Sequence, residues 1–239
     1  MLHIEEILQR HPNGATKPFL CVADDENKYY VKGLNATFDG LIAEWVCYQL
    51  AKSFELVTPH AELMEVPFEM LEIDIDYQFS LGEGVLFGSQ VVPFTIDVPN
   101  ISSISSVKCS YLKHLLLFDR WICNGDRTMS VRGGRANLLL NSIGDLFVFD
   151  HNLALDTSEI LNDDWKQYHI TVNALADWEP DLLDIVRYQD MLKEAIGRVE
   201  GICDTVPQSW WDRAKVNTRA SVSELLTRDV DEFIGGLRK

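Results

Sequence analysis

Four polar residues in two parts of the sequence could together transfer a phosphoryl group. Lys32 ends an apolar segment in the first third of the chain, and Asp126, Asn137 and Asp150 follow one another within residues 118–152. Phosphoryl transfer needs a carboxylate to orient the attacking hydroxyl, oxygen ligands for Mg²⁺ and a cation on the nucleotide phosphates. These four side chains supply those three kinds of group, which makes them the candidate reactive set.

The two aspartates each follow an apolar segment. Asp126 comes after residues 112–123, and Asp150 comes directly after residues 146–149. Each could simply end a turn or a strand, where Asp is common. Two carboxylates at such positions are nevertheless costly to bring together unless they share a cation, which favours a metal site. Asp119 instead falls on the apolar face of a helical pattern, which predicts a buried structural acceptor that braces the loop.

The other two members of the set also have ordinary structural explanations. A lysine at the end of a strand is usually solvated. Asn137 could satisfy a turn or a strand-end amide. The functional interpretation therefore depends on the joint presence of all four residues in one order along the chain.

The elements that position Lys32 can be predicted from the first third of the chain. Residues 19–22 and 29–32 are rich in apolar and aromatic side chains and flank a polar turn at 24–27. This arrangement is typical of a β-hairpin and places Lys32 at the end of its second strand.

A helix is predicted to follow this hairpin. Apolar residues recur at helical spacing over residues 38–52, which predicts an amphipathic helix packed against the sheet, with Glu44 at the edge of its apolar stripe. Another strand is expected over residues 61–66. The Gly-rich residues 81–92 have no clear pattern and receive no assignment.

The character of the chain changes at residues 97–106, a polar segment rich in Pro and Ser that few core contacts are expected to cross. Helical patterns then dominate, over residues 107–123, 174–203 and 221–237. A strand-rich first part and a helix-rich second part predict an α+β fold with two lobes around a cleft. We place the N-terminal lobe at residues 1–96 and the C-terminal lobe at residues 97–239.

The charge balance limits the kinds of partner. The chain has 21 Lys and Arg residues against 37 Asp and Glu residues, a formal net charge of −16. Such a surface repels a phosphate backbone, so nucleic acid is not expected as a direct partner. The charge does not exclude a nucleoside triphosphate as a ligand, because a few local donors and a metal ion can hold it.

The cysteines and the N-terminus bear on the compartment. The five cysteines are scattered without a C-x-x-C pair, which indicates neither a zinc site nor a disulfide framework and favours a reducing cytoplasm. Residues 1–10 carry Glu5, Glu6 and Arg10 where a signal peptide needs an apolar run. No stretch reaches the roughly 18 apolar residues of a membrane span. We therefore expect a cytoplasmic protein without a membrane partner.

Six short segments, taken in order, resemble the HipA-like kinase family, which shares its catalytic layout with protein kinases and phosphoinositide kinases. These segments are NGATKP at 13–18, YVKG at 30–33, EW at 44–45, NGDRT at 124–128, NLLL at 137–140 and DHN at 150–152. Each is short, whereas their joint order and spacing are fairly specific. The resemblance implies a bilobal kinase-like fold and an ATP- and Mg²⁺-dependent kinase. The implied acceptor is a hydroxyl group of a protein Ser or Thr, of the chain itself or of a small molecule.

The resemblance also implies a role for each matching residue. Asp126 is expected to orient the acceptor hydroxyl as the catalytic base, and Asp150 to bind Mg²⁺ in the place of the Asp in the D-F-G triplet. Asn137 is the second expected metal ligand. Lys32 is expected to contact the nucleotide phosphates, with Glu44 as a partner that holds the lysine extended.

Two loops complete the expected site. The backbone amides of Gly14, Ala15 and Thr16 could approach the phosphates closely, although an ordinary turn explains this segment about as well. Asn137 stands 11 positions after Asp126, whereas kinase catalytic loops usually leave about five. Arg135 occupies the place where a second Asn would be expected, which leaves the second Mg²⁺ ligand open.

Two other functions deserve comparison with a kinase. Asp150 after an apolar strand weakly resembles the nucleophile of haloacid dehalogenase phosphatases, but that chemistry needs a second carboxylate at position 152, which is Asn. The other alternative is a kinase-like module that binds nucleotide weakly or not at all and acts through protein contacts. Trp210 and Trp211 could serve such contacts, although paired tryptophans more often pack in a core.

Overall fold

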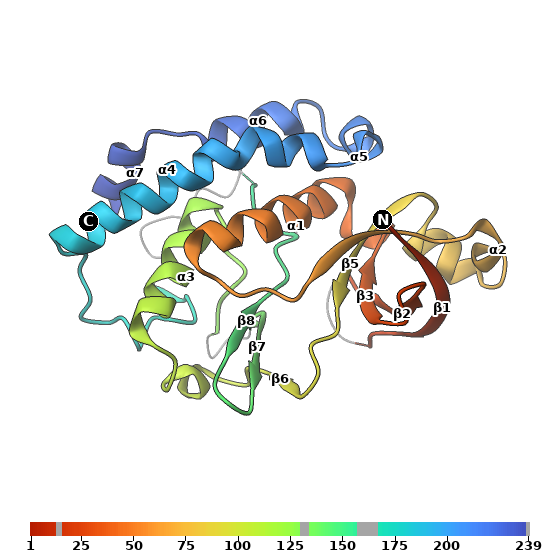
Figure 1. Ribbon diagram of the computed structural model, residues 1–239, viewed down its shortest axis with the longest axis horizontal. Helices are drawn as coiled ribbons and strands as arrows, with labels where there is room; N and C mark the ends of the chain where they lie inside the picture. Colours follow the sequence, from red (N-terminus) through yellow and green to blue (C-terminus); the bar gives the residue numbers. More distant parts are fainter. Residues whose placement is uncertain (13–15, 130–133, 157–166, 238–239) are drawn as a thin grey trace.

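A computed structural model of the chain describes residues 1–12, 16–129, 134–156 and 167–237. Strands gather in the N-terminal part and helices dominate the C-terminal part (Figure 1). The protein therefore has the mixed α+β composition, with a strand-rich first part, that its sequence predicts.

The N-terminal strands of the described chain form a closed five-stranded barrel in the order β1-β2-β3-β5-β4. The strands are β1 (Leu2–Arg10), β2 (Phe19–Ala23), β3 (Lys28–Lys32), β4 (Ala61–Glu65) and β5 (Val85–Gln90). The predicted hairpin is confirmed, since β2 and β3 are antiparallel with Leu20 opposite Tyr30. Lys32 is the last residue of β3, as expected.

Two strands of the barrel were not predicted. The pairing of β1 with β2 is interrupted by register shifts between Ile4 and Glu6 and between Ile7 and Gln9, which removes the regular alternation of apolar residues. In β5 the consecutive residues 86–88 are all buried, so this strand also lacks a period of two.

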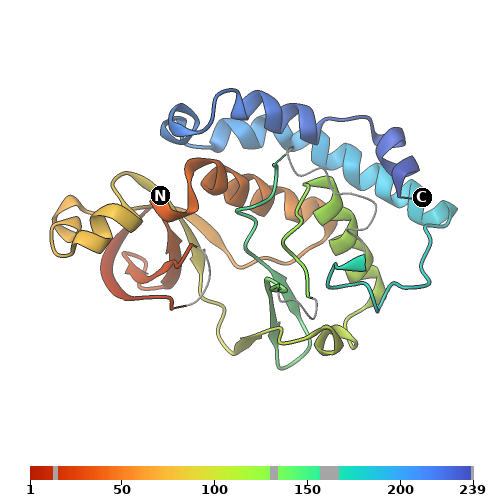
Figure 2. The same cartoon turned by 180° about the vertical axis from the view of Figure 1, so that it is seen from behind.

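Helix α1 (Phe38–Ala51) agrees closely with the predicted range, but it is not amphipathic. Ten of its 14 residues are buried, among them Glu44. The helix contacts α4 and α5 on one side and β5 of the barrel on another, and both views show it inside the molecule (Figure 1, Figure 2). A helix enclosed on several sides has no solvated face, which explains why its apolar residues are not confined to one stripe.

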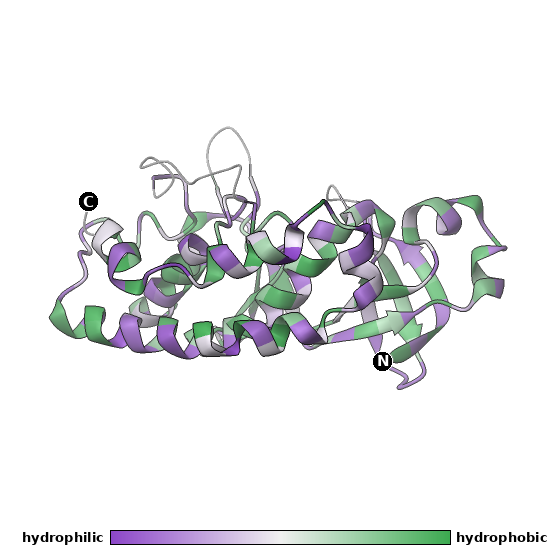
Figure 3. Ribbon diagram, turned by 90° about the horizontal axis from the view of Figure 1, so that it is seen from above, coloured by the Kyte–Doolittle hydropathy of each residue, from purple (hydrophilic) through white to green (hydrophobic). Residues whose placement is uncertain are grey.

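The C-terminal part packs helices around α1 and a small sheet. The helices are α3 (Cys109–Trp121), α4 (Leu182–Thr205), α5 (Gln208–Arg213), α6 (Thr218–Leu226) and α7 (Val230–Gly236). Along them hydrophobic and hydrophilic residues alternate (Figure 3), which is typical of helices with one face toward a core. An antiparallel sheet in the order β6-β7-β8 consists of β6 (Thr95–Asp97), β7 (Leu138–Asn141) and β8 (Leu146–Val148).

Short elements connect these units. Helix α2 (Phe68–Leu71) lies between β4 and β5, 3₁₀ turns span Leu34–Ala36, Lys52–Phe54 and Ile101–Ile104, and a π turn spans Tyr77–Leu81. None of the helices in the described part of the chain is long and apolar enough to cross a membrane.

Two predicted helices differ from the structure at their ends. The pattern at 174–203 becomes a helix only from Leu182, because the Asp181 carboxylate caps its first turn by accepting the backbone N–H of Leu183 and of Asp184, each at 2.8 Å. The pattern at 221–237 is interrupted, because Asp229 caps a new helix, α7.

In the described part of the chain, the buried apolar residues form two clusters. The smaller cluster fills the barrel, and the larger one joins α1 to the C-terminal helices and the small sheet. Val98 and Ile104, in the segment 97–106 where few core contacts are expected, belong to the larger cluster. A lobe boundary between residues 96 and 97 stays a prediction.

Candidate active site

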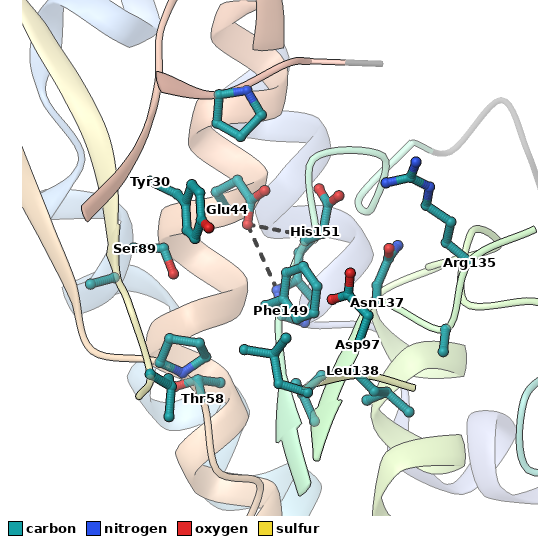
Figure 4. A pocket seen from close by; sticks show the side chains of 18 of the residues that line it. Tyr30, Glu44, Thr58, Ser89, Asp97, Arg135, Asn137, Leu138, Phe149 and His151 are labelled. Carbon is teal, nitrogen blue, oxygen red and sulfur yellow. Dashed lines mark hydrogen bonds and ion pairs between the residues drawn. The ribbon is translucent and has the colours of Figure 1, made fainter. Parts of the chain in front are cut away.

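A cavity of about 500 Å³ is lined by residues of both the barrel and the C-terminal part (Figure 4). Its wall includes segments of β3, α1 and β5, residues 91–98 with strand β6, and residues 134–139 and 148–151. Of the predicted residues that the structure describes, five line this cavity, namely Thr16, Lys32, Glu44, Asn137 and Asp150. Residues that are up to 134 positions apart in the sequence therefore meet in one cavity.

Lys32 lies at the centre of an ion-pair cluster in this cavity. Its Nζ donates to Glu44 Oε1 and, at 2.5 Å, to Asp150 Oδ1. The end of β3, the middle of α1 and the residue after β8 are thereby joined. The neighbouring Gly33 is needed for this packing, since a Cβ there would lie 1.9 Å from the Leu81 carbonyl oxygen.

The charges of this cluster control one another. Burial lowers the pKa of Lys32, but the attraction of the Glu44 and Asp150 carboxylates outweighs it and raises that pKa above its ordinary value. Burial raises the pKa of Asp150, but the Lys32 charge outweighs it and holds that pKa below its usual range. For Glu44 burial is the stronger effect, and its pKa lies above its ordinary value in spite of Lys32. Lys32 and Asp150 are consequently charged at neutral pH.

Glu44 also fixes the chain just after Asp150. Its Oε2 accepts the backbone N–H of His151 at 3.0 Å, and Figure 4 shows Glu44 pointing from α1 toward His151. The His151 ring is buried, and burial lowers its pKa to about 3, so the ring is neutral at physiological pH. Its neutral, buried state agrees with a structural role for this histidine.

Asp126 and Asn137 form a second polar pair beside the cavity. Asn137 Nδ2 donates to Asp126 Oδ2 at 2.9 Å, in spite of the long loop between the two residues. This bond uses the amide nitrogen of Asn137 and orients its side chain, so that the amide oxygen is a separate acceptor. Asp126 is half-buried in the loop after α3, and its backbone N–H donates to Asn124 Oδ1 at 3.3 Å.

Both predicted metal ligands have an unusual backbone conformation. The φ angle is 50° at Asn137 and 59° at Asp150, in the left-handed region where Asn and Asp occur more readily than other non-glycine residues. Residues held there are concentrated at functional sites, because the surrounding structure must fix them.

Arg127 supplies that fixation and was missed in the sequence. Its side chain is fully buried, and Nη1 donates to the carbonyl oxygens of Asn137 at 2.5 Å and Phe149 at 3.3 Å. Its Nε donates to Asp119 Oδ2 at 2.7 Å. One guanidinium thus connects the chain at Asn137 to the chain just before Asp150. The available signals were the place of Arg127 in the matching segment NGDRT at 124–128 and its closeness in sequence to the predicted buried acceptor Asp119.

Asp119 has the predicted structural role. It is completely buried, accepts Asn124 Nδ2 at 2.8 Å and lies 3.0 Å from His169 Nε2. Burial raises the pKa of Asp119, but the Arg127 charge outweighs it and lowers that pKa to about 2. The carboxylate therefore stays charged and braces the loop that carries Asp126.

The remaining predicted residues belong to the loop between β1 and β2. Gly14 and Ala15 lie outside the described residues. Thr16 is half-buried and lines the cavity. Its contribution to phosphate binding stays a prediction.

The oxygen atoms of the site suit a hard cation. Among the described residues, no group of three or more His, Cys, Asp or Glu side chains could hold a metal ion. Mg²⁺ does not need such a group, because one or two carboxylates usually hold it together with substrate phosphates and water. The Asp150 carboxylate and the Asn137 amide oxygen are donors of the required type.

Comparisons with known proteins bear on the fold and the family of the chain. The crystal structure of the Helicobacter pylori proinflammatory kinase CtkA is similar, with a TM-score of 0.54, 11% sequence identity, and coverage of 96% of this chain and 95% of that chain. At this identity the likeness shows the fold alone. No curated protein matches the chain. The sequence matches the family model of the HipA-like kinases over residues 4–233, and the chain therefore belongs to the HipA-like kinase family.

Proposed function

We propose that the protein is an ATP- and Mg²⁺-dependent kinase that transfers the γ-phosphoryl group to a hydroxyl acceptor, namely a Ser or Thr of a protein or of the chain itself. The observation that carries this proposal is the Lys32–Glu44–Asp150 cluster in the wall of the cavity, with the Asp126–Asn137 pair beside it. In this proposal residues 1–96 and 97–239 are the two lobes, and the cavity is the cleft between them.

The cavity suits a nucleotide in size and lining. Small-molecule sites commonly measure about 300–1,000 Å³, and this cavity measures about 500 Å³. Apolar side chains for the faces of a base come from both sides of it, including Ala61, Phe87, Leu138 and Val148. Lys32 is the buried cation in the same wall and would contact the phosphates.

Asp150 and Asn137 would hold Mg²⁺ beside the phosphates. When bound, the cation neutralises charge on the transferred group. Arg127 keeps the backbone of both ligand segments in place, so the ligands need little rearrangement. Lys32 already contacts Asp150, which places the phosphate-binding cation and the metal ligand next to each other.

Asp126 would orient the acceptor hydroxyl and take its proton. The bond from Asn137 holds one carboxylate oxygen, and among the described residues the other oxygen is left for the acceptor. Asp119 cannot take this role, because its side chain is fully buried and its carboxylate oxygens are engaged by Arg127, Asn124 and His169.

Transfer of radiolabelled phosphate tests the proposal. Purified protein is incubated with γ-labelled ATP and Mg²⁺, alone and with a cell lysate, and the labelled residue is mapped by mass spectrometry. We expect Mg²⁺-dependent labelling of Ser or Thr that is lost in Asp126→Asn. A Mg²⁺-dependent thermal shift with ATP is measured in parallel.

The non-enzymatic alternative predicts a different result in both assays. A protein-interaction module gives neither labelling nor a thermal shift over a wide range of ATP concentrations. Trp210 offers no docking surface for such a module, because it is fully buried and its Nε1 donates to the Val85 carbonyl oxygen at 2.8 Å.

A further inference from the structure

A second cation lines the cavity in addition to Lys32. Arg135 lies near the end of the long loop between Asp126 and Asn137, which distinguishes this chain from the usual kinase pattern, and its side chain is exposed. Figure 4 shows it extending from the same side of the cavity as Asn137. We propose that Arg135 is a phosphate-binding residue that contacts the terminal phosphates of the nucleotide. This inference rests on the proposed function and deepens it.

The need for another cation follows from the state of Lys32. Its ammonium group is already paired with Glu44 and Asp150, so it brings little uncompensated charge to a nucleotide. The wall also contains the exposed Asp97. A triphosphate that entered this cavity would meet the carboxylates of Glu44, Asp97 and Asp150. In the described part of the wall, the cations that could offset this negative charge are Lys32 and Arg135.

Arg135 has a guanidinium group available for a ligand. Within the described ranges, its side chain makes no hydrogen bond or ion pair. A guanidinium presents N–H donors in a planar fork that matches two phosphate oxygens, and such charge-assisted bonds are among the strongest in proteins.

The backbone on both sides of Arg135 is fixed. Gly134 has a φ of 113°, and a Cβ at this residue would lie 2.3 Å from the Thr128 carbonyl oxygen. On the other side, Arg127 Nη1 donates to the carbonyl oxygen of Ala136 at 3.1 Å. Binding by Arg135 therefore needs mainly its side chain to be ordered, which keeps the entropic cost of binding low.

The test compares nucleotide binding by three variants of the full chain. Arg135→Gln removes the charge, Arg135→Lys keeps it without the fork, and Lys193→Gln removes one positive charge from the exposed face of α4 as a control. Calorimetry measures the dissociation constants for ATP with Mg²⁺ and for adenosine. Circular dichroism verifies that each variant is folded.

We expect Arg135→Gln to bind ATP about 10- to 100-fold more weakly, the effect of one charge-assisted hydrogen bond, and to bind adenosine unchanged. Arg135→Lys should recover part of the affinity, and Lys193→Gln should resemble the wild type. ATP affinity in Arg135→Gln equal to that of the wild type overturns the inference but not the proposed function. Equal losses for adenosine and ATP also overturn it, because they indicate a disturbed cavity. A wild-type protein that binds no ATP with Mg²⁺ overturns both.

Discussion

Replacement of Lys32 by Met should lower the stability of the fold as well as phosphoryl transfer. Methionine keeps most of the aliphatic packing but removes the cation between Glu44 and Asp150. The side chain of Glu44 is only 3% exposed, so its charge is left almost without water. Removing one partner of a buried ion pair typically costs about 3–5 kcal/mol. Asp150 is 26% exposed and adds less, because water partly hydrates it.

The loss should depend on pH. Burial already raises the pKa of Glu44 above its ordinary value of 4.5, and the variant lacks the lysine that opposes this effect. The folded variant then binds a proton more tightly than the unfolded chain does, so its stability falls as pH rises from the ordinary Glu value through the raised one. Urea denaturation at pH 7 and pH 5 should therefore show a larger loss relative to the wild type at pH 7.

A double variant isolates the charge effect. Glu44→Gln added to Lys32→Met removes the orphaned charge, and it should recover about 0.5–3 kcal/mol at pH 7, the usual range for coupled neighbours. Phosphoryl transfer should stay absent in this double variant, because no cation is restored. A free energy of unfolding for Lys32→Met equal to that of the wild type at pH 7 would refute the argument that Lys32 is a buried structural cation.

Three further predictions concern single residues of the site. Asp150→Asn should abolish the Mg²⁺-dependent thermal shift with ATP, because an amide oxygen carries no full charge to balance the cation. Asn137→Ala should reduce the shift less. A larger loss in Asn137→Ala than in Asp150→Asn would indicate that Asn137 is the main metal ligand. Asp126→Asn should slow transfer by at least about 10²-fold with little change in ATP affinity by calorimetry; near wild-type transfer would reject it as the base. Arg127→Met should lower the free energy of unfolding, measured by urea denaturation, by about 3–5 kcal/mol, because it leaves the buried Asp119 carboxylate without the guanidinium that balances its charge; a loss below about 1 kcal/mol would contradict this.

Local patterns explain which parts of the fold could be predicted. The β2–β3 hairpin has two segments rich in apolar and aromatic residues with a polar turn between them, and all of these lie within a few positions of each other. Strand β1 lacks a regular alternation of apolar and polar residues, because two register shifts interrupt its pairing with β2. Helix α1 could be located by its spacing, but its enclosure depends on α4 and α5, more than 130 positions later in the chain.

The site shows the same division between residue types and spatial partners. Lys32, Glu44, Asn137 and Asp150 could be chosen because phosphoryl transfer needs those groups, and all four line one cavity. Arg127 could not be chosen in this way, because a loop arginine is usually exposed. Its burial becomes intelligible only when Asp119, Asn137 and Phe149 are close in space.

This arrangement makes the site largely independent of its ligand. The Arg127 guanidinium binds main-chain carbonyl oxygens, so it holds the positions of Asn137 and of the residue before Asp150 whatever their side chains do. Asp119 keeps that guanidinium in place from within the core. Lys32 and Glu44 hold the side chain of Asp150 and the backbone of His151 from the opposite wall. Two separate ion-pair networks therefore fix the two sides of Asp150, and binding energy need not be used to assemble it.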